Sequence, residues 1–325
     1  MVLPNSRFGF YTRKKKSKKA LWAAGIVFVL GAVFLTLALT GVFRSSGEEN
    51  SGLPPVPEET LASLWEKLNY EELNRRCEEI LSRNPLDIEA LSYNGFAYFY
   101  RGVGQFSMEE RLNLINLSIA NLRKALIHEP NPLTGSLQFI LGKAYYLKGR
   151  YYYDLAIKYL ELSLASGYQG DDTYEYLGLS YTALDMPEKS AQYYLRALEN
   201  ASGAAGDGRH SDTLYLSLAQ AYLQLDKNAE AEDCLNQVMD LTQDQGVEEK
   251  SRFLLGRIYT GRGDIAGAET QYRLILEKNA SAADAHYYLG EIYETQGDGA
   301  RARYEWRKAV EIDPYHYGAR LKLYG

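Results

Sequence analysis

A short motif recurs six times along this 325-residue chain, and its regular return limits the chain to a repeat architecture. Each copy centres on a small residue, with a tyrosine three residues later and, in five copies, a leucine directly before it. The small residues are Gly95, Gly142, Gly178, Ala219, Gly256 and Gly290, and the tyrosines are Tyr98, Tyr145, Tyr181, Tyr222, Tyr259 and Tyr293. The numbering of the small residues indicates a basic unit of about 34 residues, which the last two copies match and which the others exceed through insertions.

A second set of packing residues follows the motif at offsets of 12, 16 and 19 from the small residue. In the last unit these are Ala302, Trp306 and Ala309. Spacings of four and three place such residues on one face of a second helix. Turn-forming residues lie between the two helices, namely Gly149, Asp185, Gly263 and Gly297. Each unit is therefore predicted to be a helical hairpin, in which a large residue of the second helix fills the space beside the small residue of the first.

This alternation of small and large positions, repeated from unit to unit, resembles the tetratricopeptide repeat. The resemblance covers residues 54–325 and implies an all-α, right-handed solenoid of helix-turn-helix hairpins, with the packed part over 58–325. We count seven units, the first from Pro54 to Asp87, and a final helix after Pro314 that covers the end of the stack. Thirteen extra residues, mostly around 103–117, either lengthen one hairpin or form a loop. Residues 200–212, rich in Gly and Ala, are expected to permit a bend after the fourth unit.

Residues 20–43 form an uncharged stretch that as a helix would span about 36 Å, against about 30 Å of membrane hydrocarbon. We predict an uncleaved transmembrane helix; a long signal peptide is the alternative, although no small-residue cleavage site follows. The preceding basic cluster RKKKSKK places residues 1–19 in the cytoplasm by the positive-inside rule. Residues 44–57, with Ser, Gly and three prolines, are predicted to be a flexible linker. The repeats would then lie across the membrane.

Charge and motif content exclude several classes of function. The chain has 36 basic and 42 acidic residues, and seven of the basic ones precede residue 20, so the rest carries a net charge of −13 that would repel nucleic acid. The four histidines lack metal-ligand spacing, and the two cysteines, Cys77 and Cys234, are expected to be buried thiols. No phosphate loop or nucleophile–base set appears, so we expect no enzyme, metal or cofactor.

Two kinds of short motif have an ordinary structural interpretation beside a functional one. The string GRGD, Gly261 to Asp264, resembles an integrin-recognition sequence, but Gly263 and Asp264 also supply the turn and helix cap that the repeat requires. Asn116, Asn200 and Asn279 begin N-x-S sequons, which matter only in a glycosylating compartment. We favour the turn-and-cap interpretation of GRGD.

The family resemblance also implies a binding groove lined by the first helix of each unit. Carried over by position, the candidate groove residues are Phe96, Phe99, Phe139, Lys143, Tyr146, Leu179, Leu216, Gln220, Leu223, Phe253, Arg257 and Tyr287. The family's carboxylate clamp needs several basic and amide residues in adjacent units, and Lys143, Gln220 and Arg257 do not provide them. An apolar peptide or a helix is therefore the expected ligand.

Taken together, these features predict a non-enzymatic scaffold, similar to membrane-anchored bacterial periplasmic tetratricopeptide repeat proteins. It would be tethered by one helix to the bacterial inner membrane, with its repeats in the periplasm. The resemblance to such proteins implies that it would recruit protein partners there for secretion, cytochrome maturation, cell division or a periplasmic flagellar collar. A periplasmic holdase chaperone for unfolded secreted proteins is the alternative, and a eukaryotic origin would change the compartment. No nucleic acid or small-molecule substrate is expected.

Overall fold

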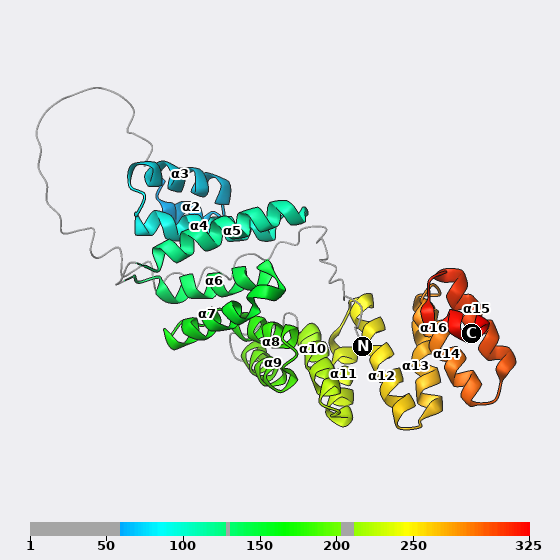
Figure 1. Cartoon of the computed structure of the whole chain (residues 1–325). Helices are drawn as coiled ribbons and strands as arrows, with labels where there is room; N and C mark the ends of the chain where they lie inside the picture. Colours follow the sequence, from blue (N-terminus) through cyan, green and yellow to red (C-terminus); the bar gives the residue numbers. More distant parts are fainter. Residues whose placement is uncertain (1–58, 128–130, 203–210) are drawn as a thin grey trace, which may run out of the picture. The chain divides into compact units, whose positions relative to one another are not determined.

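Seven helical hairpins and one further helix make up the described part of the chain (Figure 1). The computed structural model describes residues 59–127, 131–202 and 211–325. The hairpins are α2 (Leu61–Glu66) with α3 (Tyr70–Arg83), α4 (Ile88–Val103) with α5 (Met108–Ala125), α6 (Thr134–Lys148) with α7 (Tyr153–Ala165), α8 (Thr173–Ala183) with α9 (Pro187–Ser202), α10 (Ser211–Gln224) with α11 (Asn228–Leu241), α12 (Gln245–Gly261) with α13 (Ile265–Lys278), and α14 (Ala283–Thr295) with α15 (Gly299–Ile312). The short 3₁₀ helix η1 (Arg150–Tyr152) precedes α7, and α16 (Tyr317–Tyr324) ends the chain.

The turn and the cap that the sequence predicts at Gly263 and Asp264 are both present. Asp264 begins α13, because its side chain accepts a hydrogen bond from the Gly267 amide at 2.9 Å. The preceding residue, Gly263, has φ 82°, a left-handed conformation that a residue with a Cβ adopts only under strain. The GRGD string thus serves as the turn and cap of the sixth hairpin.

The predicted small and large residues face each other within the hairpins. A Cβ on Gly178 would lie 2.7 Å from the ring of Tyr194, and a Cβ on Gly256 would lie 2.6 Å from the ring of Tyr272. Both rings are buried, with 1% and 0% of their surface exposed. Absence of a side chain at the glycine therefore lets the two helices approach closely, and the ring fills the space beside it.

The insertion near residues 103–117 lengthens a hairpin. It extends α4 to Val103 and provides the first turns of α5, an 18-residue helix that begins at Met108 with Ser107 as its cap. The two helices still pair, because Leu122 of α5 occupies the position of the large residue of the repeat. It would lie 2.5 Å from a Cβ on Gly95.

The recurring tyrosine of the motif joins each of several hairpins to the one before it. The Tyr181 hydroxyl donates to Glu161 of α7 at 3.0 Å, and the Tyr293 hydroxyl donates to Glu269 of α13 at 3.2 Å. Tyr98 donates in the same way to Glu78 of α3. The motif tyrosine is therefore an inter-hairpin contact, which explains why a large polar aromatic residue recurs there.

Several predictions lie outside the described residues. These are the basic tail 1–19, the uncharged stretch 20–43 and the linker 44–57. In the described part of the chain, no helix is both long and apolar enough to cross a membrane. Part of the expected bend, 203–210, is likewise undescribed; α9 and α10 on its two sides pack against each other, and the bend stays a prediction.

Candidate protein-binding surface

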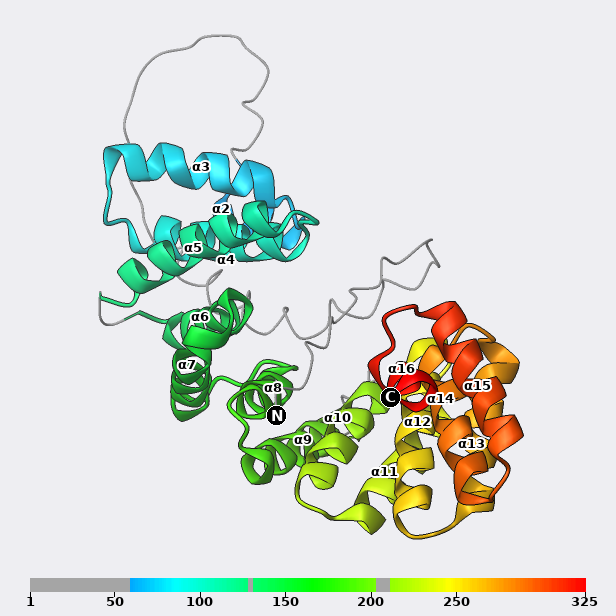
Figure 2. The ribbon, with the colours of Figure 1, turned by 45° about the vertical axis from the view of Figure 1, so that its right-hand side comes forward.

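First helices of neighbouring hairpins lie next to each other in the first four units and again in the fifth and sixth. The contacts run from α2 to α4, from α4 to α6, from α6 to α8, and from α10 to α12. Figure 2 shows the same hairpins in succession from a second side. A row of first helices of this kind is the surface on which the twelve candidate groove residues were placed.

Four of the candidates from units two and three are buried. Phe96 and Phe139 are each 6% exposed, Phe99 is 1% exposed and Lys143 is 8% exposed. The three phenylalanines share one apolar cluster with residues of α4 to α8. In this conformation the four side chains pack against neighbouring helices, so a partner would reach little of their surface.

Lys143 is held by both charge and aromatic rings. Its Nζ lies 2.6 Å from Oδ2 of Asp172, at the start of α8. The same Nζ lies 4.8 Å from the ring centroid of Tyr176 and 5.0 Å from that of Phe139. These distances fit cation–π contact. Lys143 therefore links α6 to α8 rather than projecting toward solvent.

The remaining candidates lie beside three different apolar clusters. Tyr146 is half-buried and meets the Tyr176 ring edge-on, with the ring centroids 5.2 Å apart. Leu179 and Leu223 pack around a second cluster that contains the buried Leu216, and Gln220 is half-buried. Phe253 and Tyr287 border a third cluster, and Arg257 is exposed. The structure thus groups the candidates into three local sets, and their role in binding stays a prediction.

A set of aromatic residues beside these candidates was not predicted. Its half-buried members are Trp65, Tyr70, Tyr100 and Tyr176, and Tyr168 is 39% exposed. Trp65 could have been found from the repeat, since it lies one repeat length before Phe99. Tyr168 lies in the segment between α7 and α8, where no helical spacing indicates its direction.

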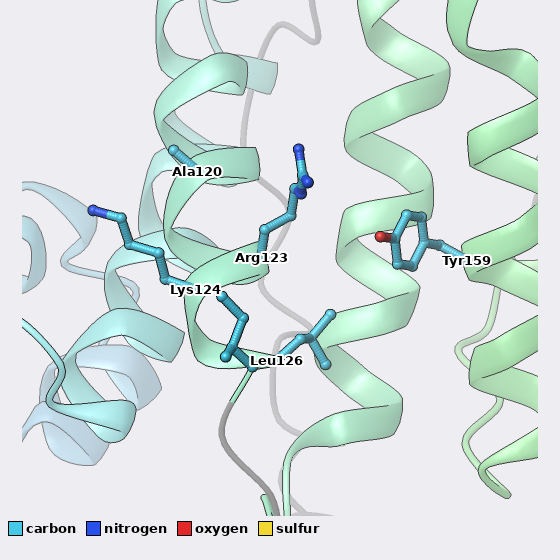
Figure 3. A pocket seen from close by; sticks show the side chains of 6 residues that line it. Ala120, Arg123, Lys124, Leu126 and Tyr159 are labelled. Carbon is cyan, nitrogen blue, oxygen red and sulfur yellow. The ribbon is translucent and has the colours of Figure 1, made fainter.

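A shallow pocket among the described residues lies on a different part of the surface. It has a volume of about 530 Å³ and is lined by Ala120, Arg123, Lys124, Leu126 and Ile127, from the end of α5, and by Tyr159 of α7. In Figure 3 the Tyr159 ring extends from α7 toward α5, on the side where Arg123 projects. None of the twelve candidates lines this pocket, whereas Phe253 lines a second one of about 520 Å³ beside α12 and α14.

Potential metal ligands and two thiols are present among the described residues. No group of three or more His, Cys, Asp or Glu in these ranges is placed to hold a metal ion. Cys77 and Cys234 are both buried thiols, as predicted, and burial raises the pKa of Cys77 to about 12 and that of Cys234 to about 11. Neither thiol is a ready nucleophile near neutral pH, because the thiolate form is disfavoured.

Comparison with protein families agrees with the hairpin geometry. Residues 171–244 and residues 253–317 each match a family described as tetratricopeptide repeat. These two stretches are tetratricopeptide repeats. Domains built of tetratricopeptide repeats are typically non-catalytic and bind proteins and peptides. The repeats of this chain therefore form a protein–protein interaction scaffold. No curated protein matches the chain.

Solved structures show the same fold at low sequence identity. The C-terminal part of a tetratricopeptide repeat protein from Cytophaga hutchinsonii is 16% identical, with a TM-score of 0.60 over 82% of this chain and 98% of that one. A tetratricopeptide repeat protein from Parabacteroides merdae is 17% identical, with a TM-score of 0.52 over 72% and 90% of the two chains. PilF from Pseudomonas aeruginosa is also 17% identical, with a TM-score of 0.52 over 70% and 95%. At these identities the likeness concerns the fold alone.

Proposed function

We propose that this tetratricopeptide repeat chain is a membrane-tethered scaffold that recruits protein partners and helps to assemble envelope complexes. The observation that carries the proposal is that first helices of neighbouring hairpins lie next to each other, in units one to four and again in units five and six. Their half-buried and exposed side chains, among them Tyr146, Gln220, Phe253 and Arg257, are available to a bound polypeptide. Such a surface suits an extended peptide or an amphipathic helix.

The N-terminal sequence supports the tether. An uncharged stretch, 20–43, follows a basic cluster, a pattern typical of a single span with a cytoplasmic N-terminus. The repeats would then lie in the periplasm of a bacterium. Tethering confines the scaffold to a thin layer and raises its effective concentration beside other membrane proteins. Secretion, cytochrome maturation, cell division and a periplasmic flagellar collar are the processes proposed for it.

Site-specific photo-crosslinking tests partner binding in cells. Arg257, exposed on the first helix of the sixth unit, is replaced by a photo-reactive amino acid, and the same replacement at Asp240, exposed on the second helix α11, is the control. We expect one or two defined proteins to crosslink at Arg257 and not at Asp240. A broad range of unrelated proteins would instead favour the holdase alternative, and identical products from both positions would refute a binding role for the first helices.

Protease protection tests the tether separately. In spheroplasts, added protease should digest the repeats while an N-terminal tag stays protected. Protected repeats in intact spheroplasts, with digestion after lysis, would show that the proposed orientation is wrong.

A further inference from the structure

Aromatic rings of the first two hairpins form a connected surface beside the candidate groove. The Trp65 ring centroid lies 5.6 Å from that of Tyr70 and 5.5 Å from that of Tyr100. Tyr70 and Tyr100 are stacked, with centroids 5.4 Å apart and an angle of 16° between the planes. The three rings come from α2, α3 and α4 and are half-buried, so part of each ring reaches solvent.

A series of contacts connects these rings to a carboxylate. The Tyr100 ring meets the Phe99 ring edge-on, with centroids 5.2 Å apart, and Nζ of Lys143 lies 5.7 Å from the Phe99 centroid and 2.6 Å from Oδ2 of Asp172. Burial raises the pKa of Tyr100 to about 12, and the neighbouring Tyr70 and the charges of Asp172 and Asp171 add to the effect. Asp171 is exposed, and Tyr168 beside it is 39% exposed. We call the set of these residues the aromatic–acidic surface: Trp65, Tyr70, Tyr100, Tyr168, Asp171 and Asp172.

The cation built into this surface is already fully engaged. Lys143 pairs with Oδ2 of Asp172 and lies against three rings, and its side chain is only 10% exposed. The other oxygen of Asp172, Oδ1, is buried and accepts no hydrogen bond from the described residues. Asp171 adds a further negative charge with no ion pair of its own among the described residues. Lys143 supplies one positive charge against the two negative charges of Asp171 and Asp172, so the surface keeps a net negative charge.

We propose that the aromatic–acidic surface binds cationic side chains, arginine above all, of a protein partner. The proposal rests on the scaffold function and specifies the chemistry of the partner. Ring faces carry the negative part of the aromatic quadrupole and attract a cation. A guanidinium is weakly hydrated and planar, so it can stack on Tyr100 or Trp65 while donating hydrogen bonds to a carboxylate. An acidic partner would be repelled here, and a purely apolar one would leave the carboxylates without a counter-charge.

The test compares two peptides that differ in charge alone. The probes are fluorescently labelled acetyl-GLRFGLRFG-amide and the same peptide with both arginines replaced by citrulline, a neutral analogue of nearly the same shape. Binding to the full chain in mild detergent is measured by fluorescence anisotropy at about 20 mM and about 200 mM salt. We expect the arginine peptide to bind at least about tenfold more tightly at low salt, with a smaller advantage at high salt.

Matched variants locate the effect on the surface. Asp171→Asn should weaken binding of the arginine peptide about three- to fivefold, because an exposed charge contributes modestly, and should leave the citrulline peptide unchanged. Asp240→Asn, which removes the same charge from an exposed position on α11, should change binding less than twofold. Tyr168→Leu keeps the inner carbons of the side chain and removes the ring; it should weaken the arginine peptide selectively.

Three results would overturn the proposal: equal binding of both peptides, equal effects of Asp171→Asn and Asp240→Asn, or no binding of either peptide at about 1 mM. Equal binding of the two peptides would leave the scaffold function intact, since the first helices would still bind a polypeptide. Failure of the scaffold function itself would show in the absence of crosslinked partners in cells. The two failures are thus distinguishable.

Discussion

Substitution of Gly256 by alanine tests the close approach of α12 and α13. The added Cβ would lie 2.6 Å from Cζ and 2.8 Å from Cε1 of Tyr272. The Tyr272 ring cannot move aside at low cost, because it is fully buried and stacks on Tyr288 with centroids 5.5 Å apart. The helices must separate or the ring must leave its rotamer, and overpacking of this kind costs about 1–3 kcal/mol.

Gly261→Ala is the matched control, because Gly261 belongs to the same helix and a Cβ there would meet no heavy atom within 4 Å. This substitution should change the stability by less than about 1 kcal/mol, in the stabilising direction, since alanine restricts the unfolded chain. Urea unfolding followed by far-ultraviolet circular dichroism measures both variants. The two should differ by about 1–4 kcal/mol, with a melting temperature for Gly256→Ala lower by several degrees.

A double-mutant cycle identifies the contact itself. Gly256→Ala combined with Tyr272→Leu should be less destabilised than the sum of the two single variants, with a coupling energy of about 0.5–3 kcal/mol. Additive effects would refute the small-and-large packing on which the hairpin register depends. So would a Gly256→Ala variant as stable as Gly261→Ala.

Three further predictions concern charge and burial. Lys143→Met should destabilise the chain by about 2 kcal/mol in urea unfolding, because it leaves Asp172 without its partner, and adding Asp172→Leu should recover part of the loss. The Lys278 ammonium, together with Arg252, holds the pKa of Glu248 below its usual 4.5. The ion pair therefore stabilises the fold above that pH, and its contribution is lost as the pH falls through the lower pKa of the folded state. In unfolding measured at a series of acid pH values, the stability advantage of the unsubstituted chain over Glu248→Gln should shrink below about pH 4.5. Cys77, fully buried with a raised pKa, should react with a thiol reagent at about pH 8 only after urea unfolds the chain, and rapid labelling of the native protein would contradict its burial.

Much of the fold could be predicted because its signals are local. Small and large residues at offsets of 16, such as Gly178 and Tyr194, lie on adjacent helices of one hairpin, where the turn length fixes their alignment. Caps such as Asp264 act within three residues of their own position. The insertion near residues 103–117 was the exception, because its composition was compatible with a loop or a helix. In the structure most of it is helical, as the end of α4 and the start of α5, which pairs with α4.

The candidate surface could be predicted only in part. Register with the family identifies the helix face of Phe96, Phe139 and Lys143 but not how far the next hairpin covers it. Their low exposure means that Phe139→Ala would first lower stability, so it cannot serve as a clean test of binding.

The sequence by itself determined the repeat, the hairpin register and the burial of the small and large packing residues, since each depends on spacing within about one unit. Only the tertiary structure decided that Lys143 of α6 pairs with Asp172, which lies in the next unit, and that the ring of Tyr168 lies against that of Phe139, with centroids 5.6 Å apart. The physical reason is that contacts between hairpins depend on the insertions and on the competition of neighbouring side chains for the same space. The spacing of residues within a single helix encodes neither the effect of the insertions nor the outcome of that competition.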